Sequence, residues 1–498
     1  MIENNTDNQY KIIIKATSIF GIMQIMKMII SVIGSKFVAI FLGPVGIGTV
    51  GLLTNTLNII LSISSFGIAT TSVREIAVAQ ADDNPDKLPE TIAIHQKIVL
   101  FTGLLAAIIT ILLSKFLSQW TFGKSNYQSW FLVLSINFVI IGLATIRASI
   151  LQGKQLLRAI AISNIVSSFL ITICTIILYY FLKFEGIVWV ILSSSLITLF
   201  VNYYFTRNFK SKAVNKTFLE FVSKAKPIMQ LGFLLSINSI FGLVCTYIIK
   251  FYLNNNGASA QILGFYEVST VILISYVGMI FNAMAVDFYP RLTIVNQDNT
   301  KIIELVNNQL EIALLLITPA IIALYLLAPI VVKLLYTTDF LPTVFILKAA
   351  LLAIIIKAIV WPLGFIILAK GDKKQYFKQE LVSDFLNVSL TIWFYRLFGL
   401  TGIGFAMLVN YIVYGIYVYV TVNRAYGFSY RNDCLKIILF SSIVGICACA
   451  TVLLCGSDFV TIILVFLLLV SIIFSYKGLD KRIGLGSFII YVKKKIFR

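Results

Sequence analysis

Long apolar runs separated by short basic stretches dominate this sequence of 498 residues. Each run is close to or above the ~20 residues that a helix needs to cross the hydrocarbon core of a bilayer. The fourteen runs, within a few residues, are 12–42, 49–73, 92–117, 129–151, 159–182, 186–206, 228–253, 262–288, 310–335, 343–369, 379–398, 401–422, 435–455 and 459–476. The pattern predicts an all-α integral membrane protein with about fourteen transmembrane helices.

The basic residues in the stretches between these runs are distributed unevenly. If every run crosses the membrane, tails and loops alternate sides, which puts 27 Lys and Arg on one side and 5 on the other when the residues near the ends of the runs are counted with the loops. Cytoplasmic loops carry an excess of Lys and Arg. We therefore expect the 27-charge side, with both termini, to face the cytoplasm.

Composition excludes several classes of function. The chain is 59% hydrophobic and 12% charged, and its longest polar stretches are too short to bury a core of their own. The net charge of +19 is explained by the basic loops of the expected cytoplasmic side and by a basic tail that can lie on anionic lipid, so it does not indicate nucleic acid binding. Gly46 to Gly51 matches a dinucleotide-binding pattern only by letters, and we expect a turn between two membrane helices there.

The sequence also contains few residues that could catalyse a reaction or bind a metal. His95 is the only histidine, and no nucleophile motif or paired-carboxylate site is apparent. We therefore predict no catalytic residue, no metal site and no cofactor. The chain is expected to be a transporter and not an enzyme.

A single constant shift of the sequence against itself aligns the first six runs with runs seven to twelve. The shift that places Gly48 on Gly264 also places Lys154 on Lys370 and Gly186 on Gly402, and we name it the repeat offset. Six crossings is an even number, so the two copies enter from the same side and form parallel repeats. The predicted domains are an N-lobe at 1–206, a cytoplasmic linker at 207–227, a C-lobe at 228–425, and two extra helices with a basic tail at 426–498.

Four short motifs resemble the multidrug/oligosaccharidyl-lipid/polysaccharide exporter superfamily, and within it the bacterial polysaccharide (O-antigen, Wzx-type) flippases. They are Phe41-Leu42-Gly43-Pro44-x-x-x-Gly48, Ser72-Val73-Arg74-Glu75, Leu151-Gln152-Gly153-Lys154 and Leu368-Ala369-Lys370-Gly371-Asp372. The resemblance implies two six-helix lobes around a V-shaped cavity and transport by alternating access. It also implies a bacterial cytoplasmic (inner) membrane protein of lipopolysaccharide, capsular or exopolysaccharide biosynthesis.

Such a flippase moves an undecaprenyl-diphosphate-linked oligosaccharide, and a bare diphosphate cannot cross hydrocarbon without fixed cations. Intramembrane charge is rare, and it commonly marks a substrate path. Lys27 and Lys357 lie near the middle of their runs, where snorkelling reaches poorly. The predicted substrate-binding cations are Lys27, Lys357, Arg147, Arg74 and Lys250. Four lysines lie near enough to helix ends for snorkelling to explain them: Lys36, Lys97, Lys250 and Lys348.

Two other transporters of the same fold remain open. A flippase of lipid II or of a teichoic-acid-type precursor shares the anionic lipid-linked substrate. A multidrug cation antiporter would favour acidic groups at mid-membrane, whereas the central charges here are basic. Membrane lipid is an expected partner of every alternative, and polysaccharide polymerase or assembly proteins are expected partners of the first.

The sequence also offers candidate residues for coupling transport to an ion and for bending a helix during transport. Asp384 and Glu267 could bind a coupling H+ or Na+, although Asp384 could instead pair with the lysines one or two turns before it. Pro362 and Gly364 interrupt a predicted helix and could form a hinge or a static kink.

Overall fold

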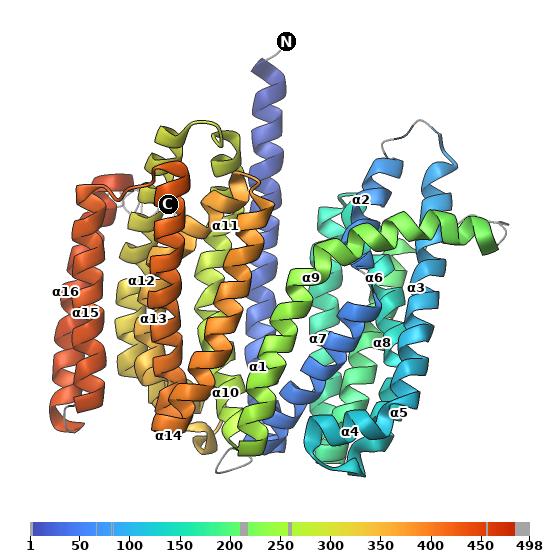
Figure 1. The fold of residues 1–498 in the computed structure, drawn as a ribbon, viewed down its shortest axis with the longest axis horizontal. Coiled ribbons are helices and arrows are strands. Elements are labelled where there is room, and N and C mark those ends of the chain that lie inside the picture. The colour runs from blue at the N-terminus through green and yellow to red at the C-terminus, as the bar shows by residue number, and fades with distance from the viewer. Residues whose placement is uncertain are drawn as a thin grey trace, which may run out of the picture. The chain divides into compact units, whose positions relative to one another are not determined.

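The computed structural model describes residues 3–65, 67–80, 82, 84–209, 218–256, 261–454 and 457–483. All regular structure in this part of the chain is helical, without a strand (Figure 1). This confirms the predicted all-α class. The predicted tail 484–498 and residues 210–217 of the predicted linker lie outside the described residues.

The chain divides into two compact units, Met1–Gly264 and Phe265–Arg498. The helices of the first unit are α1 (Glu3–Ser64), α2 (Ile68–Gln80), α3 (Lys87–Leu112), α4 (Ser114–Phe122), α5 (Gln128–Leu134), α6 (Asn137–Gly153), α7 (Leu157–Leu182), α8 (Gly186–Thr206) and α9 (Phe218–Asn256). Helix α9 packs against α1, α2 and α3, so it belongs to this unit by contact. The predicted lobes, which end at residue 206 and begin again at residue 228, are defined by the sequence repeat and stay a prediction.

The second unit is built around helix α13. Its helices are α10 (Ile262–Thr270, which begins just before the boundary), α11 (Gly278–Ile294), α12 (Asn299–Leu335), α13 (Thr343–Ala369), α14 (Lys373–Tyr426), α15 (Asn432–Leu454) and α16 (Ser457–Ile483), with a π-helical segment at Val271–Tyr276. Helix α13 packs against α12, α14 and α15. Its almost wholly apolar sequence follows from this position, since Leu347, Ile354 and Ala358 are completely buried.

Eleven helical segments of the described chain are long and apolar enough to span a membrane. Three of them contain a residue of positive φ: Met26–Ser64 at Gly43, Leu157–Thr206 at Lys183, and Lys373–Tyr426 at Gly399. Positive φ interrupts a helix and is easiest for glycine. The count of fourteen crossings stays a prediction. The expected turn at Gly46 to Gly51 is wrong by a few residues, because the break lies at Gly43 and residues 46–51 are helical.

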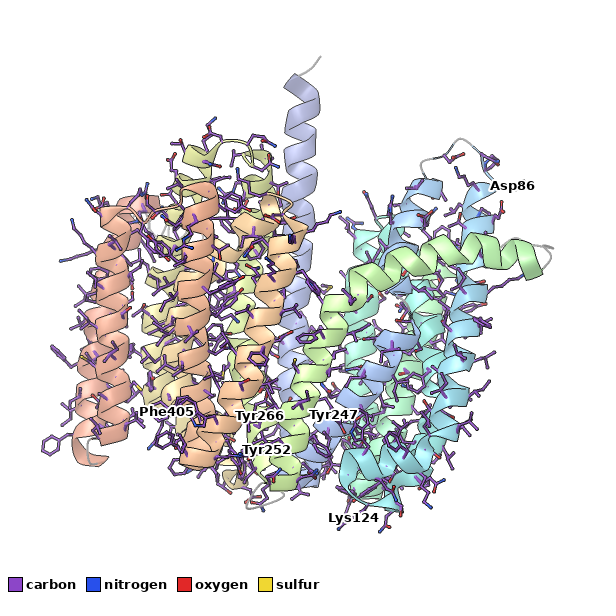
Figure 2. All side chains as sticks on the ribbon, viewed as in Figure 1. Asp86, Lys124, Tyr247, Tyr252, Tyr266 and Phe405 are labelled. Atoms are coloured by element: carbon purple, nitrogen blue, oxygen red, sulfur yellow. The ribbon has the colours of Figure 1, made fainter. Side chains whose placement is uncertain are left out.

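The two ends of the first unit carry different loops. Asp86, next to Lys87, lies at one end, and Lys124 lies at the other (Figure 2). The sequence assigns Lys87 to the strongly basic side and Lys124 to the weakly basic one, so the placement of these two loops agrees with the predicted alternation.

The internal repeat is visible in the backbone of the turns. Gln155 and Gly371 are equivalent under the repeat offset, and both have positive φ, 53° and 70°. In each turn the next residue donates its amide N–H to the carbonyl five residues earlier, at 3.0 Å and 3.3 Å. Lys183 and Gly399, a second equivalent pair, have φ of 46° and 57°. The sequence repeat therefore corresponds to a repeat of local structure.

Side chains at one pair of turns repeat as well. The ammonium group of Lys154 donates to the amide oxygen of Gln80, and that of Lys370 donates to the backbone carbonyl of Asn296. The two acceptor residues are also equivalent under the repeat offset. Each lysine lies over an aromatic ring, at 4.5 Å and 5.7 Å from the ring centroid. These two lysines therefore hold neighbouring turns together in both repeats.

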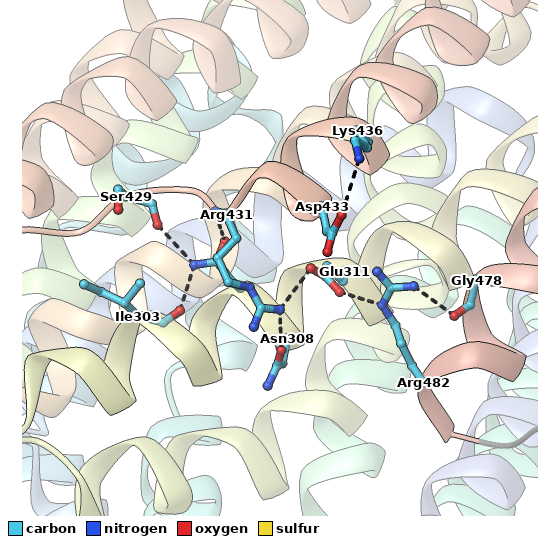
Figure 3. A network of polar contacts seen from close by, with 10 residues as sticks. Ile303, Asn308, Glu311, Ser429, Arg431, Asp433, Lys436, Gly478 and Arg482 are labelled. Atoms are coloured by element: carbon cyan, nitrogen blue, oxygen red, sulfur yellow. Dashed lines mark hydrogen bonds and ion pairs between the residues drawn. The ribbon is translucent and has the colours of Figure 1, made fainter.

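A buried carboxylate ties helices α15 and α16 to α12 (Figure 3). Glu311 on α12 is 3% exposed and accepts from Arg482 on α16 at 2.5 Å and from Arg431 at 3.1 Å. Arg431 precedes α15 and donates its backbone N–H to Asn307 at 2.9 Å. One acidic side chain thus fixes both of the helices that have no counterpart in the repeat.

The repeat supplies a matched pair of glycines for testing the packing at the turns. A Cβ on Gly402 would lie 2.0 Å from the carbonyl oxygen of Phe394, whereas a Cβ on its counterpart Gly186 would lie 3.1 Å from that of Leu178. Overpacking of this kind costs about 1–3 kcal/mol. We expect Gly402→Ala to lower the thermal stability of the purified protein clearly and Gly186→Ala to lower it less. Equal stability of the two variants would contradict this packing.

Candidate functional site

Helices α13 and α14 of the second unit line a partly open cavity of about 230 Å³. Its lining combines one cation, one carboxylate, one amide and several aromatic rings. The lining residues are Lys357, Val360, Trp361, Gly364, Phe365, Leu368, Tyr376, Gln379, Glu380, Tyr411 and Tyr414. We name it the α13–α14 cavity.

The register of the two helices explains why these side chains meet. Lys357, Trp361, Gly364 and Leu368 recur at three- and four-residue intervals, so they share one face of α13. The first half of α14, after the turn at Gly371, presents Tyr376, Gln379 and Glu380 to the cavity, and the second half, after Gly399, presents Tyr411 and Tyr414. The cavity therefore depends on the break in α14.

Among the residues that the structure describes, Lys357 is the one cation that lines the cavity. At 1.5 Å per residue it lies about 18 Å along α13 from the end of that helix at Ala369. Its Nζ lies 5.2 Å from the centroid of the Phe281 ring on α11 and 5.8 Å from that of Tyr411. Among the described residues, no carboxylate oxygen lies within 4.0 Å of this ammonium group. Aromatic faces therefore stabilise the charge where an acidic partner would otherwise be needed.

The acidic residues near the cavity are on α14. Glu380 lines the cavity, and Asp384 follows one turn later and is half-buried. The ion pair considered for Asp384 with Lys373, Lys374 or Lys378 is not formed within the described chain. Glu267 lies on α10 and is half-buried. A role of Asp384 or Glu267 in ion coupling stays a prediction.

The buried amide of Gln379 was missed by sequence reasoning, as were Glu380 and the aromatic residues. Gln379 is 3% exposed, and its Oε1 accepts no hydrogen bond from the described residues. The helical spacing of polar and aromatic residues around Lys357 was the available signal. It was weak, because aromatic residues occur throughout these apolar runs.

The other predicted cations lie in the first unit. Lys27 on α1 and Arg74 on α2 are exposed, and the guanidinium of Arg147 on α6 lies 4.9 Å above the ring of Tyr203 on α8. Lys250 on α9 is buried and donates to the carbonyl oxygen of Gly51 at 3.2 Å. Of the predicted substrate cations and hinge residues, the structure brings together Lys357, Pro362 and Gly364. No group of three or more His, Cys, Asp or Glu in the described chain could hold a metal ion.

Pro362 is buried inside α13, next to the cavity. Proline removes the hydrogen bond to the carbonyl four residues earlier, which weakens the helix locally. We expect Pro362→Ala to restore this bond to Ala358 and to slow transport several-fold if α13 bends during the transport cycle. Export rates and the accessibility of single cysteines in the cavity measure the effect. Pro329→Ala, at an exposed site in α12, is the control. Unchanged rates and accessibility in Pro362→Ala would show a static kink.

Comparison with known protein families decides what kind of chain this is. Residues 13–295 match the family described as "Polysaccharide biosynthesis protein". The chain belongs to this polysaccharide biosynthesis family. No curated protein matches the sequence significantly.

Solved structures with similar folds include a flippase and several transporters. The lipid II flippase MurJ, in an inward closed conformation, is 16% identical with a TM-score of 0.65, and the match covers 94% of this chain and 99% of that one. An inward-facing multidrug resistance MATE family transporter is 15% identical with a TM-score of 0.64, covering 82% and 98%. A transporter of the MOP superfamily from Pyrococcus furiosus is 15% identical with a TM-score of 0.56, covering 82% and 96%. At these identities the likeness shows the fold, and the chain is a multi-pass membrane protein of this fold.

Proposed function

We propose that this protein is a flippase that translocates an undecaprenyl-diphosphate-linked oligosaccharide across the bacterial cytoplasmic membrane by alternating access. The oligosaccharide would be the repeat unit of an O-antigen, a capsular polysaccharide or an exopolysaccharide. The observation that carries the proposal is the α13–α14 cavity. It places a cation, hydrogen-bonding groups and aromatic rings between the apolar helices of a polysaccharide biosynthesis protein.

The physical problem of the substrate explains why these groups are needed. The polyprenyl chain can stay in lipid, but the diphosphate and the sugar hydroxyls lose water when they enter the protein, and this loss must be compensated. Fixed cations bind phosphate oxygens strongly in a low dielectric. In our proposal Arg147, Lys27 and Arg74 offer such charges in the first unit, and Lys357 is a further cation of the substrate path in the second.

Orientation, coupling and partners complete the proposal. The uneven distribution of Lys and Arg supports cytoplasmic termini in the inner membrane. Asp384 or Glu267 would bind the coupling H+ or Na+, since both are half-buried carboxylates on membrane-spanning segments. Polymerase or assembly proteins would receive the translocated unit.

A reconstitution experiment tests the proposed function. The full-length protein is placed in liposomes with the lipid-linked intermediate isolated from the producing cells, and glycan at the outer leaflet is oxidised with membrane-impermeant periodate. We expect the inner-leaflet pool to become accessible with time, in contrast to protein-free liposomes. A pool that stays protected with active reconstituted protein would contradict the proposal.

Two alternative functions have specific support, and the same liposome assay distinguishes them from the proposed one. The similarity of fold to a lipid II flippase over nearly the whole chain favours lipid II as a substrate. Glu380 in the cavity favours an organic cation, and a structural neighbour is a MATE multidrug transporter in complex with the dye rhodamine 6G. Transport of lipid II or of rhodamine 6G without transport of the glycan-linked intermediate would assign the protein to one of these classes.

A further inference from the structure

The α13–α14 cavity has no chemical counterpart in the first repeat. Under the repeat offset, Lys357 corresponds to Ile141. The residues Trp361, Phe365, Gln379, Glu380, Tyr411 and Tyr414 correspond to Thr145, Ser149, Ser163, Asn164, Ser195 and Thr198. The turns, and the contacts by which Lys154 and Lys370 hold neighbouring turns together, are present in both repeats. The first repeat builds the same turns and lysine contacts without these groups, so the repeated turns do not explain their presence.

The charge of the cavity disfavours the diphosphate as that ligand. Lys357 and Glu380 contribute one positive and one negative charge to the lining, and Asp384 lies one turn beyond Glu380. A diphosphate diester is a dianion, and a lining that holds one cation and one carboxylate offers it no net positive charge. The diphosphate is better held where cations are in excess.

The polar groups of the cavity suit a neutral molecule that both donates and accepts hydrogen bonds. The Oε1 of Gln379 is buried without a donor among the described residues, and an acceptor left in that state costs about 1–3 kcal/mol. Glu380 is a further acceptor, and Lys357 has ammonium donors that no described carboxylate occupies. Sugar hydroxyl groups can satisfy both kinds.

The apolar part of the lining suits a sugar ring as well. Trp361, Phe365, Tyr376 and Tyr414 present aromatic surface around these polar groups, and aromatic faces pack well against the C–H faces of a pyranose. The volume of about 230 Å³ is below the ~300–1,000 Å³ of pockets for drug-sized ligands. It accommodates one or two sugar rings and not a whole repeat unit.

We propose that the α13–α14 cavity is a carbohydrate subsite. One sugar ring of the lipid-linked glycan stacks on the aromatic side chains, while Gln379, Glu380 and Lys357 form hydrogen bonds to its hydroxyl groups. The diphosphate is bound outside this cavity. The inference rests on the proposed function and assigns Lys357 to the sugar instead of the phosphate.

Binding of two separate probes tests the assignment. The full-length protein in lipid nanodiscs is titrated with the oligosaccharide released from the intermediate by mild acid, and separately with undecaprenyl diphosphate. We expect Trp361→Ala and Gln379→Leu to weaken glycan binding about tenfold, which is the size of one stacking or hydrogen-bonding contact. Binding of undecaprenyl diphosphate should stay within about twofold of the wild type. Trp361→Phe, which keeps an aromatic face, should retain most of the glycan affinity.

Trp393→Ala is the matched control, because Trp393 is an exposed tryptophan on α14 outside the cavity. The assignment is overturned if Trp361→Ala and Gln379→Leu weaken the binding of undecaprenyl diphosphate and leave the binding of the glycan unchanged. It is also overturned if Glu380→Gln abolishes binding of rhodamine 6G while glycan binding persists. If Trp361→Ala fails to fold, the glycan affinities of Gln379→Leu and Trp361→Phe still test the assignment. Failure of the wild type to flip the intermediate in liposomes would instead refute the proposed function.

Discussion

Lys357→Ala is expected to abolish display of the glycan at the cell surface while the amount of protein in the membrane stays unchanged. Within the described part of the chain this side chain is the one cation lining the α13–α14 cavity, and its removal leaves Glu380 there without a compensating charge from these residues. Lys357→Arg should retain partial activity because the positive charge survives. Surface glycan is measured by immunoblotting or flow cytometry, and the membrane protein by quantitative blotting.

Lys348→Ala provides the matched control. Lys348 lies on the same helix nine residues earlier, outside the cavity, with its Nζ 5.1 Å above the ring of Phe345. We expect normal export from this variant. Lys27→Ala should behave like Lys357→Ala if Lys27 binds the diphosphate. Normal export by both the Lys27 and Lys357 variants would refute a substrate path that uses these cations.

Of all the substitutions proposed for this protein, Glu311→Ala is expected to lower the free energy of unfolding the most. The substitution leaves Arg431 and Arg482 without their shared carboxylate, and breaking a buried ion pair on one side is strongly destabilising. Because both arginines retain some exposure, we expect a loss of about 2–4 kcal/mol. A lower midpoint of thermal unfolding in detergent and faster proteolysis near α15 and α16 would show it.

Asp433→Ala is the control for this prediction. Asp433 pairs with Lys436 at 3.6 Å, and both side chains are at least 70% exposed. Exposed pairs contribute about 0–1 kcal/mol, so this variant should keep the midpoint of the wild type. If Glu311→Ala unfolds at the same temperature as Asp433→Ala, the network does not fix the last two helices.

The class of the fold and its repeat were accessible from the sequence, because hydropathy and turn residues are local properties. The predicted runs 186–206 and 343–369 coincide with α8 and α13. The residues Gln155 and Gly371, which the repeat offset aligns, both have positive φ and are each followed by the same type of backbone hydrogen bond. Helix α12 begins earlier than predicted because Asp298 caps it, accepting from the backbone N–H groups of Thr300 and Lys301, so its first turns are polar.

The candidate site was accessible only in part. A lone charge in the middle of an apolar run is conspicuous, and this identified Lys357. Glu380, Gln379 and Tyr411 carry no such signal, since each of these residue types is common in loops and helices alike. They reach Lys357 only because α14 turns back at Gly399 and packs both of its halves against α13. The two arginines that bind Glu311 likewise lie 120 and 171 residues away along the chain. Apolar pattern determines which segments become membrane helices, whereas the side chains that meet between them are decided by packing across long sequence separations.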